Sequence, residues 1–272
     1  MGNQPMNDPE SIRVIMIGAG NVGFHLGKKL YDAGISISQV YSRAASKAER
    51  LANICGCDFT HQLTAISTEG NLYLLAVPDQ VIGDVAKKLA AIIPPSKLVV
   101  HTSGATPSTV LKTHFQHYGI FYPLQSFSLG RAVDFNQIPI CIDANAEQHR
   151  IFLEKIAQRI SRNVHTINDR ERAILHVAAV FVNNFSNHLF TIGEKITTKE
   201  NLPFDILKPL IQETVNKIQN ISPSEMQTGP AQRGDQITIQ QHLNYLEKQF
   251  PELVDLYTQM TQRINSNFQF KR

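Results

Sequence analysis

Short apolar runs alternate with helical patterns over the first 167 residues of the chain. Runs typical of strands occur at residues 12–17, 35–41, 72–77, 98–101, 118–122, 138–142 and 164–167. Between them, as in residues 22–33, 82–89 and 147–160, apolar side chains recur every three or four positions, which indicates helices with one buried face. Strands that alternate with helices predict a doubly wound, mainly parallel sheet. The sequence therefore predicts an α/β domain over residues 11–167, after a disordered arm at residues 1–10.

The strand pattern stops after residue 167, and a second domain is expected over residues 168–272. One long helix is predicted over residues 169–194, and it is apolar over most of its girth, which is typical of a buried central helix. At 100° per residue, a narrow polar stripe runs along it and contains Asp169, Arg172, His176, Asn183, Asn187 and Glu194. Because His and Asn are poor helix formers with directional hydrogen bonds, the stripe favours a polar cleft between domains over bulk water. Further helices at 204–220, 236–249 and 251–267 make this domain all-helical.

The first apolar run leads directly into a glycine motif, Gly18-Ala19-Gly20-Asn21-Val22-Gly23, which opens a helix. In a Rossmann unit the first glycine makes the tight turn, the second lets the backbone approach a pyrophosphate, and the third lets helix and strand pack closely. The pyrophosphate binds the free N–H groups at the helix N-terminus. Strand, glycines and helix stand in the required order, which predicts a dinucleotide site with residues 18 to 22 at the pyrophosphate.

The end of the second apolar run indicates which dinucleotide binds. An NAD-binding unit usually has an acidic residue there, about 20 residues after the glycines, to bind the ribose 2′-hydroxyl. This chain has Ser42 and Arg43, then Lys47, with no acidic residue before Glu49. Arg43 can bind a 2′-phosphate with a planar fork of donors, and Lys47 adds positive charge. These residues could also form only an exposed basic start to a helix. The pattern favours NADP(H) over NAD.

The carboxyl ends of the later runs supply further candidates, because parallel sheets bind ligands at that edge. Ala76, Val77, Pro78 and Asp79 follow one run, and Thr102 and Ser103 follow the next, so both segments are expected to border the nicotinamide ribose. Three more polar side chains fall at the same edge: His101, Tyr122 and Gln125. Such residues are also common in ordinary loops, so both interpretations stay open for them.

The chemistry of the reaction is assigned to the second half of the chain. His176 is the first candidate for a proton donor or acceptor, because its unperturbed pKa lies near neutrality, at about 6.5. Asn183 can both donate and accept, so it could orient a substrate oxygen or nitrogen. Arg233, in a loop at 228–235 without packing periodicity, could bind an anionic substrate group in a bidentate manner. Gln125 and Asn187 complete the expected substrate-binding set. Asp235 in the same loop is at least as well explained as the cap of the next helix.

Composition changes this picture little. The 272 residues are 42% hydrophobic and 18% charged, with a formal net charge of +3, which argues for neither nucleic acid nor a membrane surface as partner. The cysteines, Cys55, Cys57 and Cys141, have the spacing of neither a disulfide framework nor a zinc site, so they are interpreted as small thiols in a reducing cytoplasm, and no metal is expected. No apolar stretch is long enough to span a bilayer. A cytoplasmic protein with a small-molecule substrate is predicted.

The motifs also resemble a known family. Gly18–Gly23, the segments 76–79 and 101–104, and Tyr122-Pro-Leu-Gln125 stand in the order seen in the 6-phosphogluconate dehydrogenase-like superfamily, which includes pyrroline-carboxylate reductase, prephenate dehydrogenase and deazaflavin-coenzyme-dependent NADP reductase. The segments 176–185 and 228–235 resemble a subgroup of uncharacterised NADP oxidoreductases with a C-terminal helical domain of unknown function. The resemblance implies a Rossmann domain followed by a helical domain that dimerises. It also implies His at the position of Tyr122, where this chain departs from the pattern.

Two functions are compatible with these features. One is an NADP(H)-dependent oxidoreductase that transfers a hydride to or from a small, anionic substrate in the interdomain cleft of a homodimer. The other is a non-catalytic NADP-binding redox sensor that acts through a protein partner. The sugar-acid dehydrogenases of the superfamily carry a catalytic Lys near the start of the long helix, and its absence between Asp169 and Glu194 favours the sensor. The polar stripe and the Arg233 loop favour the enzyme.

Overall fold

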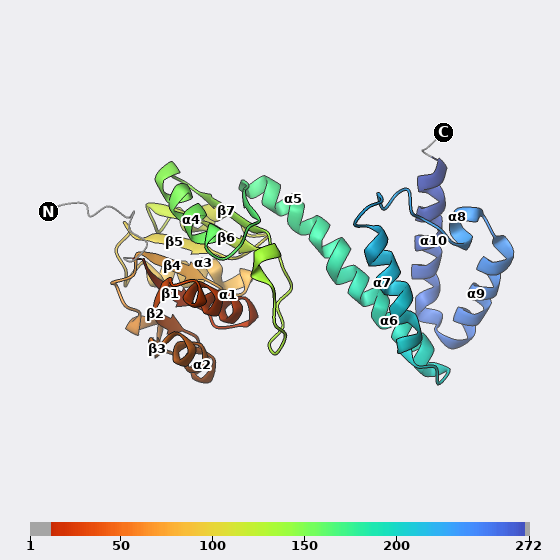
Figure 1. Ribbon diagram of the computed structural model, residues 1–272, viewed down its shortest axis with the longest axis horizontal. Coiled ribbons are helices and arrows are strands. Elements are labelled where there is room, and N and C mark those ends of the chain that lie inside the picture. Colours follow the sequence, from red (N-terminus) through yellow and green to blue (C-terminus); the bar gives the residue numbers. More distant parts are fainter. Residues whose placement is uncertain (1–11, 270–272) are drawn as a thin grey trace. The chain divides into compact units, whose positions relative to one another are not determined.

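The computed structural model describes residues 12–269 of the chain. The chain divides into two compact units, Met1–Ser186 and Asn187–Arg272, which are described separately below (Figure 1). The disordered arm expected at residues 1–10 lies outside the described residues. No helix among the described residues is long and apolar enough to cross a membrane.

The first unit contains a mixed sheet in the strand order β3-β2-β1-β4-β5-β6-β7-β8. Its strands are β1 (Arg13–Ile17), β2 (Ser36–Tyr41), β3 (Asp58–Thr60), β4 (Leu72–Leu75), β5 (Leu98–His101), β6 (His117–Pro123), β7 (Ile140–Ala144) and β8 (Val164–Thr166). Neighbouring strands are parallel except for β6 and β7, which pair antiparallel. The doubly wound α/β fold is thus confirmed. The strand that sequence analysis missed, β3, is only three residues long and partly exposed, so it carries no apolar run.

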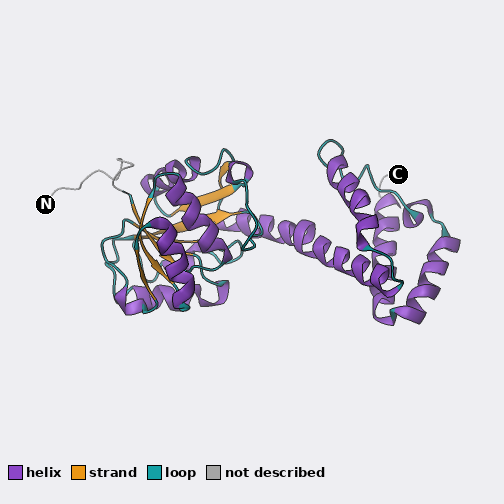
Figure 2. Ribbon diagram, turned by 60° about the horizontal axis from the view of Figure 1, so that its bottom comes forward, coloured by secondary structure: helices purple, strands orange, loops and turns teal. Residues whose placement is uncertain are grey.

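Helices cover both faces of this sheet (Figure 2). They are α1 (Asn21–Asp32), α2 (Ala45–Cys55), α3 (Ile82–Leu89) and α4 (Glu147–Gln158). Along β1, Val14 and Met16 pack into the same apolar cluster as α1, α2 and α4, whereas Ile15 and Ile17 pack against α3. Strands buried on both faces need apolar side chains at successive positions, which explains why the sequence shows continuous apolar runs there. Short 3-10 turns connect these elements at Leu63–Ala65, Asp79–Val81, Ser108–Leu111 and Phe135–Gln137.

The long helix begins at α5 (Asp169–Ala179), continues as a π-helix at Val180–Phe185, and ends as α6 (Ser186–Lys199). Its N-cap is Asn168, the residue before the predicted start of the helix, and Glu171 completes a capping box. The π-helix corrects the prediction of one uninterrupted α-helix. A π turn closes i→i+5 hydrogen bonds, so the 100° periodicity does not hold through it. The stripe predicted on that periodicity therefore breaks between His176 and the downstream residues Asn183 and Asn187.

The expected burial of this helix is also not seen within the first unit by itself. In the first unit, Ile174, Val177, Phe181, Val182 and Phe185 are between 50% and 75% exposed. Contiguous apolar patches of this kind on a folded protein usually mark an interaction surface. The apolar surface of this helix predicts a buried environment that the first unit by itself does not supply.

The second unit is all-helical, as predicted. After α6 it contains a 3-10 turn at Phe204–Leu207, α7 (Lys208–Lys217), α8 (Pro230–Arg233), α9 (Gln236–Gln249), a second 3-10 turn at Pro251–Leu253, and α10 (Val254–Gln269). The hydroxyl of Tyr245 on α9 donates to a Glu200 carboxylate oxygen at 3.0 Å, and Tyr257 on α10 lies 2.8 Å from His242 Nδ1 on α9. These contacts tie α9 to its neighbours. Asp235 accepts from the backbone N–H of Thr238 at 3.1 Å, which confirms that it caps α9.

Candidate active site

The glycine motif forms the turn between β1 and α1. Gly18 has φ +109°, and a Cβ added there would lie 2.3 Å from the carbonyl oxygen of Ala76. A Cβ on Gly23 would lie 2.0 Å from the carbonyl oxygen of Gly18. Both positions therefore need glycine, for the turn and for close packing, as the motif predicts. At Gly20 an added Cβ would meet nothing within 4 Å, and no side chain caps the helix that starts at Asn21. Backbone N–H groups and open space thus coincide where a phosphate would bind.

A cavity of about 410 Å³ opens beside this turn. Predicted cofactor residues from three separate segments line it together: Gly18, Ala19, Gly20, Ser42, Arg43, Lys47, Ala76, Val77 and Pro78. Residues that sequence analysis did not select also line it: Tyr41, Ala44, Leu63, Val81, Asp84, Val85 and Lys88. The remaining predicted cofactor residues are not part of this lining: Asn21, Val22, Asp79, Thr102 and Ser103.

The charge of this cavity is mainly positive. Arg43 and Lys47 lie at the start of α2, and Lys88 faces them from α3, against a single carboxylate, that of Asp84. Val81, Asp84 or Val85, and Lys88 follow one another at helical spacing, so this face of α3 could have been read from the sequence. A lining with three cations suits a ligand that carries phosphate groups.

The side chain of Asn21 holds a neighbouring loop. Its Nδ2 donates to the carbonyl oxygen of Phe127 at 2.9 Å, which holds the loop after β6 against α1. On the same helix, His25 stacks on Phe127 with ring centroids 5.3 Å apart. This loop carries Gln125, which lines another cavity, of about 520 Å³, together with Arg131 and Asp134. The predicted substrate residue Gln125 is therefore not among the residues that line the glycine-motif cavity.

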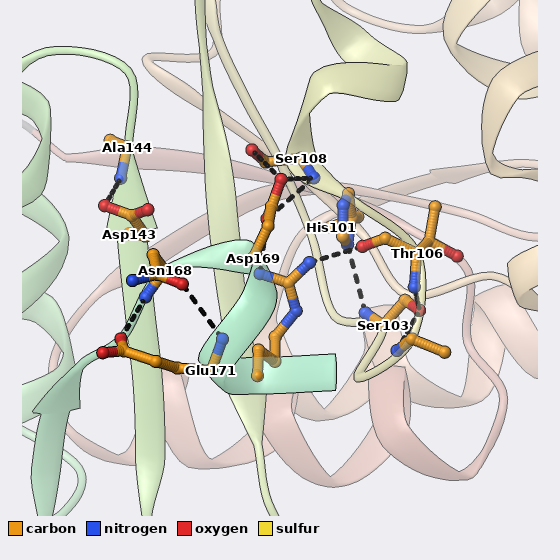
Figure 3. Close-up of polar contacts among 11 residues, drawn as sticks. His101, Ser103, Thr106, Ser108, Asp143, Ala144, Asn168, Asp169 and Glu171 are labelled. Atoms are coloured by element: carbon orange, nitrogen blue, oxygen red, sulfur yellow. Dashed lines mark hydrogen bonds and ion pairs between the residues drawn. The ribbon is translucent and has the colours of Figure 1, made fainter. Parts of the chain in front are cut away.

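A buried polar network joins the start of α5 to the loop after β5 (Figure 3). Arg172 is fully buried, forms an ion pair with Asp169 at 2.8 Å, and donates to the carbonyl oxygen of Thr106. Asp169 accepts from the backbone N–H of Ser108 at 2.9 Å and from its hydroxyl at 3.0 Å. In the loop itself, the Ser103 hydroxyl oxygen accepts from the N–H of Thr106 at 2.8 Å. The beginning of the predicted polar stripe thus faces this loop, and Arg172 Nε is the buried nitrogen of Arg172 that lacks a hydrogen-bond partner among the described residues.

The ionisable groups of this network are held in fixed protonation states. Burial opposes the ionisation of Asp169, but the hydrogen bonds from Ser108 and the charge of Arg172 outweigh it and lower its pKa. Burial, and then repulsion by Arg172, lower the pKa of His101 to about 4. The His101 Nδ1 lies 3.2 Å from the N–H of Ser103, so in the neutral ring Nδ1 accepts and Nε2 carries the proton. His101 is therefore a neutral structural residue at neutral pH.

Tyr122 and His176 form a pair next to the same loop. The Tyr122 hydroxyl, from β6, lies 3.3 Å from His176 Nδ1 on α5. A Cβ added to Gly104 would lie 2.5 Å from that nitrogen and 2.8 Å from the Tyr122 ring carbon Cζ, so the loop that begins with Thr102 and Ser103 contacts both side chains. Burial raises the pKa of Tyr122 to about 12, which keeps its hydroxyl protonated. Sequence analysis selected His176 but not its pairing with Tyr122, although the position of Tyr122 near the end of β6 was a signal.

The other predicted substrate residues are exposed. Asn183 lies in the π-helix of the first unit, whereas Asn187 and Arg233 belong to the second unit. Arg233 ends the short α8 between two glycines with positive φ, Gly229 at +110° and Gly234 at +69°. Their roles toward a substrate stay predictions. Among the residues that the structure describes, no group of three or more His, Cys, Asp or Glu side chains could hold a metal ion.

Comparison with known proteins defines the class to which this fold belongs. The model of a Rossmann-like domain matches residues 3–121, and that of a domain of unknown function, DUF2520, matches residues 138–264. The solved structure of BF3122 from Bacteroides fragilis, described as a candidate NADP oxidoreductase, is 37% identical with a TM-score of 0.90, and the match covers 95% of this chain and 100% of that one. The chain therefore belongs to this family, in which a Rossmann-like domain precedes a DUF2520 domain.

More distant structures share the fold. Protein TM1727 from Thermotoga maritima is 24% identical with a TM-score of 0.72, over 95% of this chain and 99% of that one. A reductive aminase from Aspergillus terreus, solved with NADPH and ethyl-5-oxohexanoate, is 16% identical with a TM-score of 0.66, over 96% of this chain and 100% of its own. No curated protein matches the chain in sequence. The fold is thus one that other proteins use with NADPH.

Proposed function

We propose that the protein is an NADP(H)-dependent oxidoreductase that transfers a hydride to or from a small anionic substrate. The observation that carries this proposal is the cavity at the glycine motif, where Arg43 and Lys47 stand in the place of the acidic residue of NAD-binding units. The 37% identity to a candidate NADP oxidoreductase supports it. That the substrate binds between the two domains stays a prediction from the sequence.

The residues of the cavity fit this cofactor. The open space at Gly20 and the uncapped N-terminus of α1 suit a pyrophosphate, and Arg43, Lys47 and Lys88 suit a 2′-phosphate. Leu63, Val81 and Val85 offer apolar surface for the adenine base of the cofactor. When bound, the cofactor supplies the hydride. The protein must therefore bind and orient the cofactor and the substrate, and exchange a proton with the substrate.

Tyr122 and His176 are proposed to handle that proton. The Tyr122 oxygen can accept from Nδ1–H of His176, which orients the ring and leaves Nε2 to donate a proton to the substrate or to accept one. Burial keeps the Tyr122 hydroxyl protonated, with a pKa of about 12. Tyr122 therefore carries no negative charge that would hold the His176 imidazole in its protonated form. His176 is thus the proposed acid–base residue, Tyr122 its positioning residue, and Asn183, Asn187, Gln125 and Arg233 the proposed substrate contacts.

The proposal is tested with NADPH and a panel of keto acids, imino acids and deazaflavin, by following NADPH absorbance with the full-length protein. Turnover of at least one of these classes is expected. Tight NADPH binding without turnover of any compound would instead support the non-catalytic redox sensor. Failure of NADPH to bind would contradict both functions.

Replacement of Arg43 by Ala is expected to weaken NADPH binding by about 10- to 100-fold, since hydrogen bonds to charged groups contribute roughly 1.5–3 kcal/mol. NADH binding should hardly change, because NADH lacks the 2′-phosphate. The measurement is a fluorescence titration with both dinucleotides. Lys88→Ala should act in the same direction, whereas Lys87→Ala is the matched control, since Lys87 is on α3 but does not line the cavity. Equal affinity of the wild type for NADH and NADPH would contradict the assignment to NADP(H).

We further propose that two copies of the chain pair through the exposed apolar surface of the long helix. Phe181, Val182 and Phe185 are 62%, 75% and 50% exposed, and a second copy would bury such a surface. Light scattering should give the mass of a dimer. Val182→Glu is expected to shift the protein towards the monomer, while Tyr31→Glu, at an exposed apolar residue of α1, should leave the mass unchanged. A monomeric wild type would refute this pairing.

A further inference from the structure

Two cysteines meet at the junction of α2 and β3. Cys55 is the last residue of α2, Cys57 directly precedes β3, and only Gly56 separates them. Both are free cysteines; Cys55 is buried and Cys57 is half-buried. Both side chains pack in or against the same apolar cluster of the first unit. The two thiols thus lie two positions apart and share one environment.

The backbone between them has the dimensions that a disulfide needs. Gly56 has φ 61° and ψ 39°, the left-handed helical conformation. Since peptide bonds are planar, these two angles determine the distance between the flanking Cα atoms, and helical angles of either hand give about 5.4 Å. Disulfides form when the Cα atoms are roughly 4.4–6.8 Å apart. The Cα separation of the two cysteines therefore falls within the range of disulfides.

The pair also has a reactive member. The hydrogen bond from Cys55 lowers the pKa of the Cys57 thiol, and this outweighs the effect of burial, while the same interaction raises the pKa of Cys55. The thiolate is the reactive form of cysteine. Cys57, the more exposed of the two, is the attacking sulfur, and Cys55 is the resolving one.

We propose that Cys55 and Cys57 are a redox modification site, which a peroxide converts reversibly into an intramolecular disulfide. The Cys57 thiolate attacks the peroxide O–O bond and becomes a sulfenic acid, and the departing oxygen takes up a proton. The Cys55 sulfur then attacks the Cys57 sulfur, the S–S bond forms, the S–O bond breaks, and water leaves. Two thiols are oxidised and one hydrogen peroxide is reduced to two waters. A dithiol reverses the modification by exchange.

The position of the pair connects it to the cofactor cavity. One end of α2 carries Cys55 and the other carries Lys47, which lines the cavity. Cys57 leads into β3, whose last residue, Thr60, accepts from the backbone N–H of Ser42 at 3.2 Å. An S–S bond of about 2 Å with its preferred dihedral angle would constrain the backbone at the junction of α2 and β3. We expect the disulfide to weaken NADPH binding, and this consequence rests on the proposed cofactor site.

The modification is tested first without any cofactor. The full-length protein is treated with hydrogen peroxide, and its thiols are alkylated after unfolding. We expect a loss of two hydrogens, about 2 Da, with only Cys141 still alkylated. Cys57→Ser should abolish this loss, and Cys55→Ser should leave Cys57 as a sulfenic acid that dimedone traps. Three alkylated thiols in the peroxide-treated wild type, or a loss of 2 Da in Cys57→Ser, would overturn the proposal.

The effect on the cofactor is measured separately, by NADPH titration of reduced, oxidised and re-reduced protein. Oxidation should weaken binding by about fivefold or more, a typical coupling between sites, and dithiothreitol should restore it. Cys57→Ser should bind NADPH equally before and after treatment. Unchanged affinity after the disulfide has formed would refute the link to the cavity. Lack of NADPH binding to the reduced protein would instead refute the proposed function and leave the mass measurement standing.

Discussion

Replacement of His176 by Ala is expected to lower the turnover number by about 10²- to 10⁴-fold, the usual contribution of a positioned acid–base side chain. The substrate for this measurement is the compound that the panel identifies. His176 lies on α5, with its Nδ1 3.3 Å from the Tyr122 hydroxyl, and not in the lining of the glycine-motif cavity. Binding of NADPH should therefore change by less than about twofold, since the lost interaction belongs to the transition state.

Two variants separate proton transfer from a structural effect. Tyr122→Phe keeps the ring but removes the hydroxyl that orients His176, so we expect a smaller loss of turnover than in His176→Ala. His188→Ala is the matched control, because His188 is an exposed histidine of α6 on the same long helix. Full activity of His176→Ala, with its pH profile unchanged, would exclude His176 as the acid–base residue.

Replacement of Arg172 by Met is expected to destabilise the protein by about 3 kcal/mol, at the low end for the removal of one partner of a buried ion pair. Met retains much of the apolar stem of Arg172. The loss of stability therefore measures the removal of the guanidinium charge and its hydrogen bonds. The low end applies because the Asp169 side chain is 29% exposed and keeps its bonds from Ser108. Urea unfolding at pH 7 measures the difference. Arg170→Met, at the exposed neighbouring arginine, should change stability by less than about 0.5 kcal/mol.

The same variant should change how stability depends on pH. In the native protein the pKa of His101 is about 4, against about 6.5 in the unfolded chain. Between these values the unfolded chain binds a proton that the native protein does not, so stability falls as the pH decreases from 6.5 to 4. Without the charge of Arg172, the pKa of His101 should rise and this decrease should become shallower. An unchanged slope in Arg172→Met would show that Arg172 does not act on His101.

Much of the cofactor site could be predicted from the sequence because it depends on local backbone geometry. Gly18 needs a positive φ and Gly23 needs close packing, so the motif alone predicts the strand–turn–helix unit. The end of β2 follows from the apolar run, which places Ser42 and Arg43 at the edge of the sheet. Lys88 was missed although helical spacing puts it on one face with Asp84, because only the tertiary structure shows that this face lines the cavity.

The pairing of Tyr122 with His176 and the buried network could not be predicted in this way. Tyr122 and His176 are 54 positions apart, and they meet only because α5 packs beside β6 and the Gly104 loop. Arg172 carries a charge, and charged side chains are usually exposed, so only its contacts with Asp169 and Thr106 explain its complete burial. In the same way, only the left-handed angles at Gly56 and the packing of both neighbours at one apolar cluster distinguish Cys55 and Cys57 from ordinary buried thiols.

The sequence by itself thus determined the α/β class, the strand–glycine–helix turn and the basic residues beside it, because periodicity and backbone constraints act over a few residues. The tertiary structure decided which polar residues meet. It also decided which residues of the long helix share a face. The π-helix at Val180–Phe185 departs from the 100° periodicity on which the polar stripe was predicted. Contacts between distant segments arise from strand order and helix packing, which no local pattern encodes.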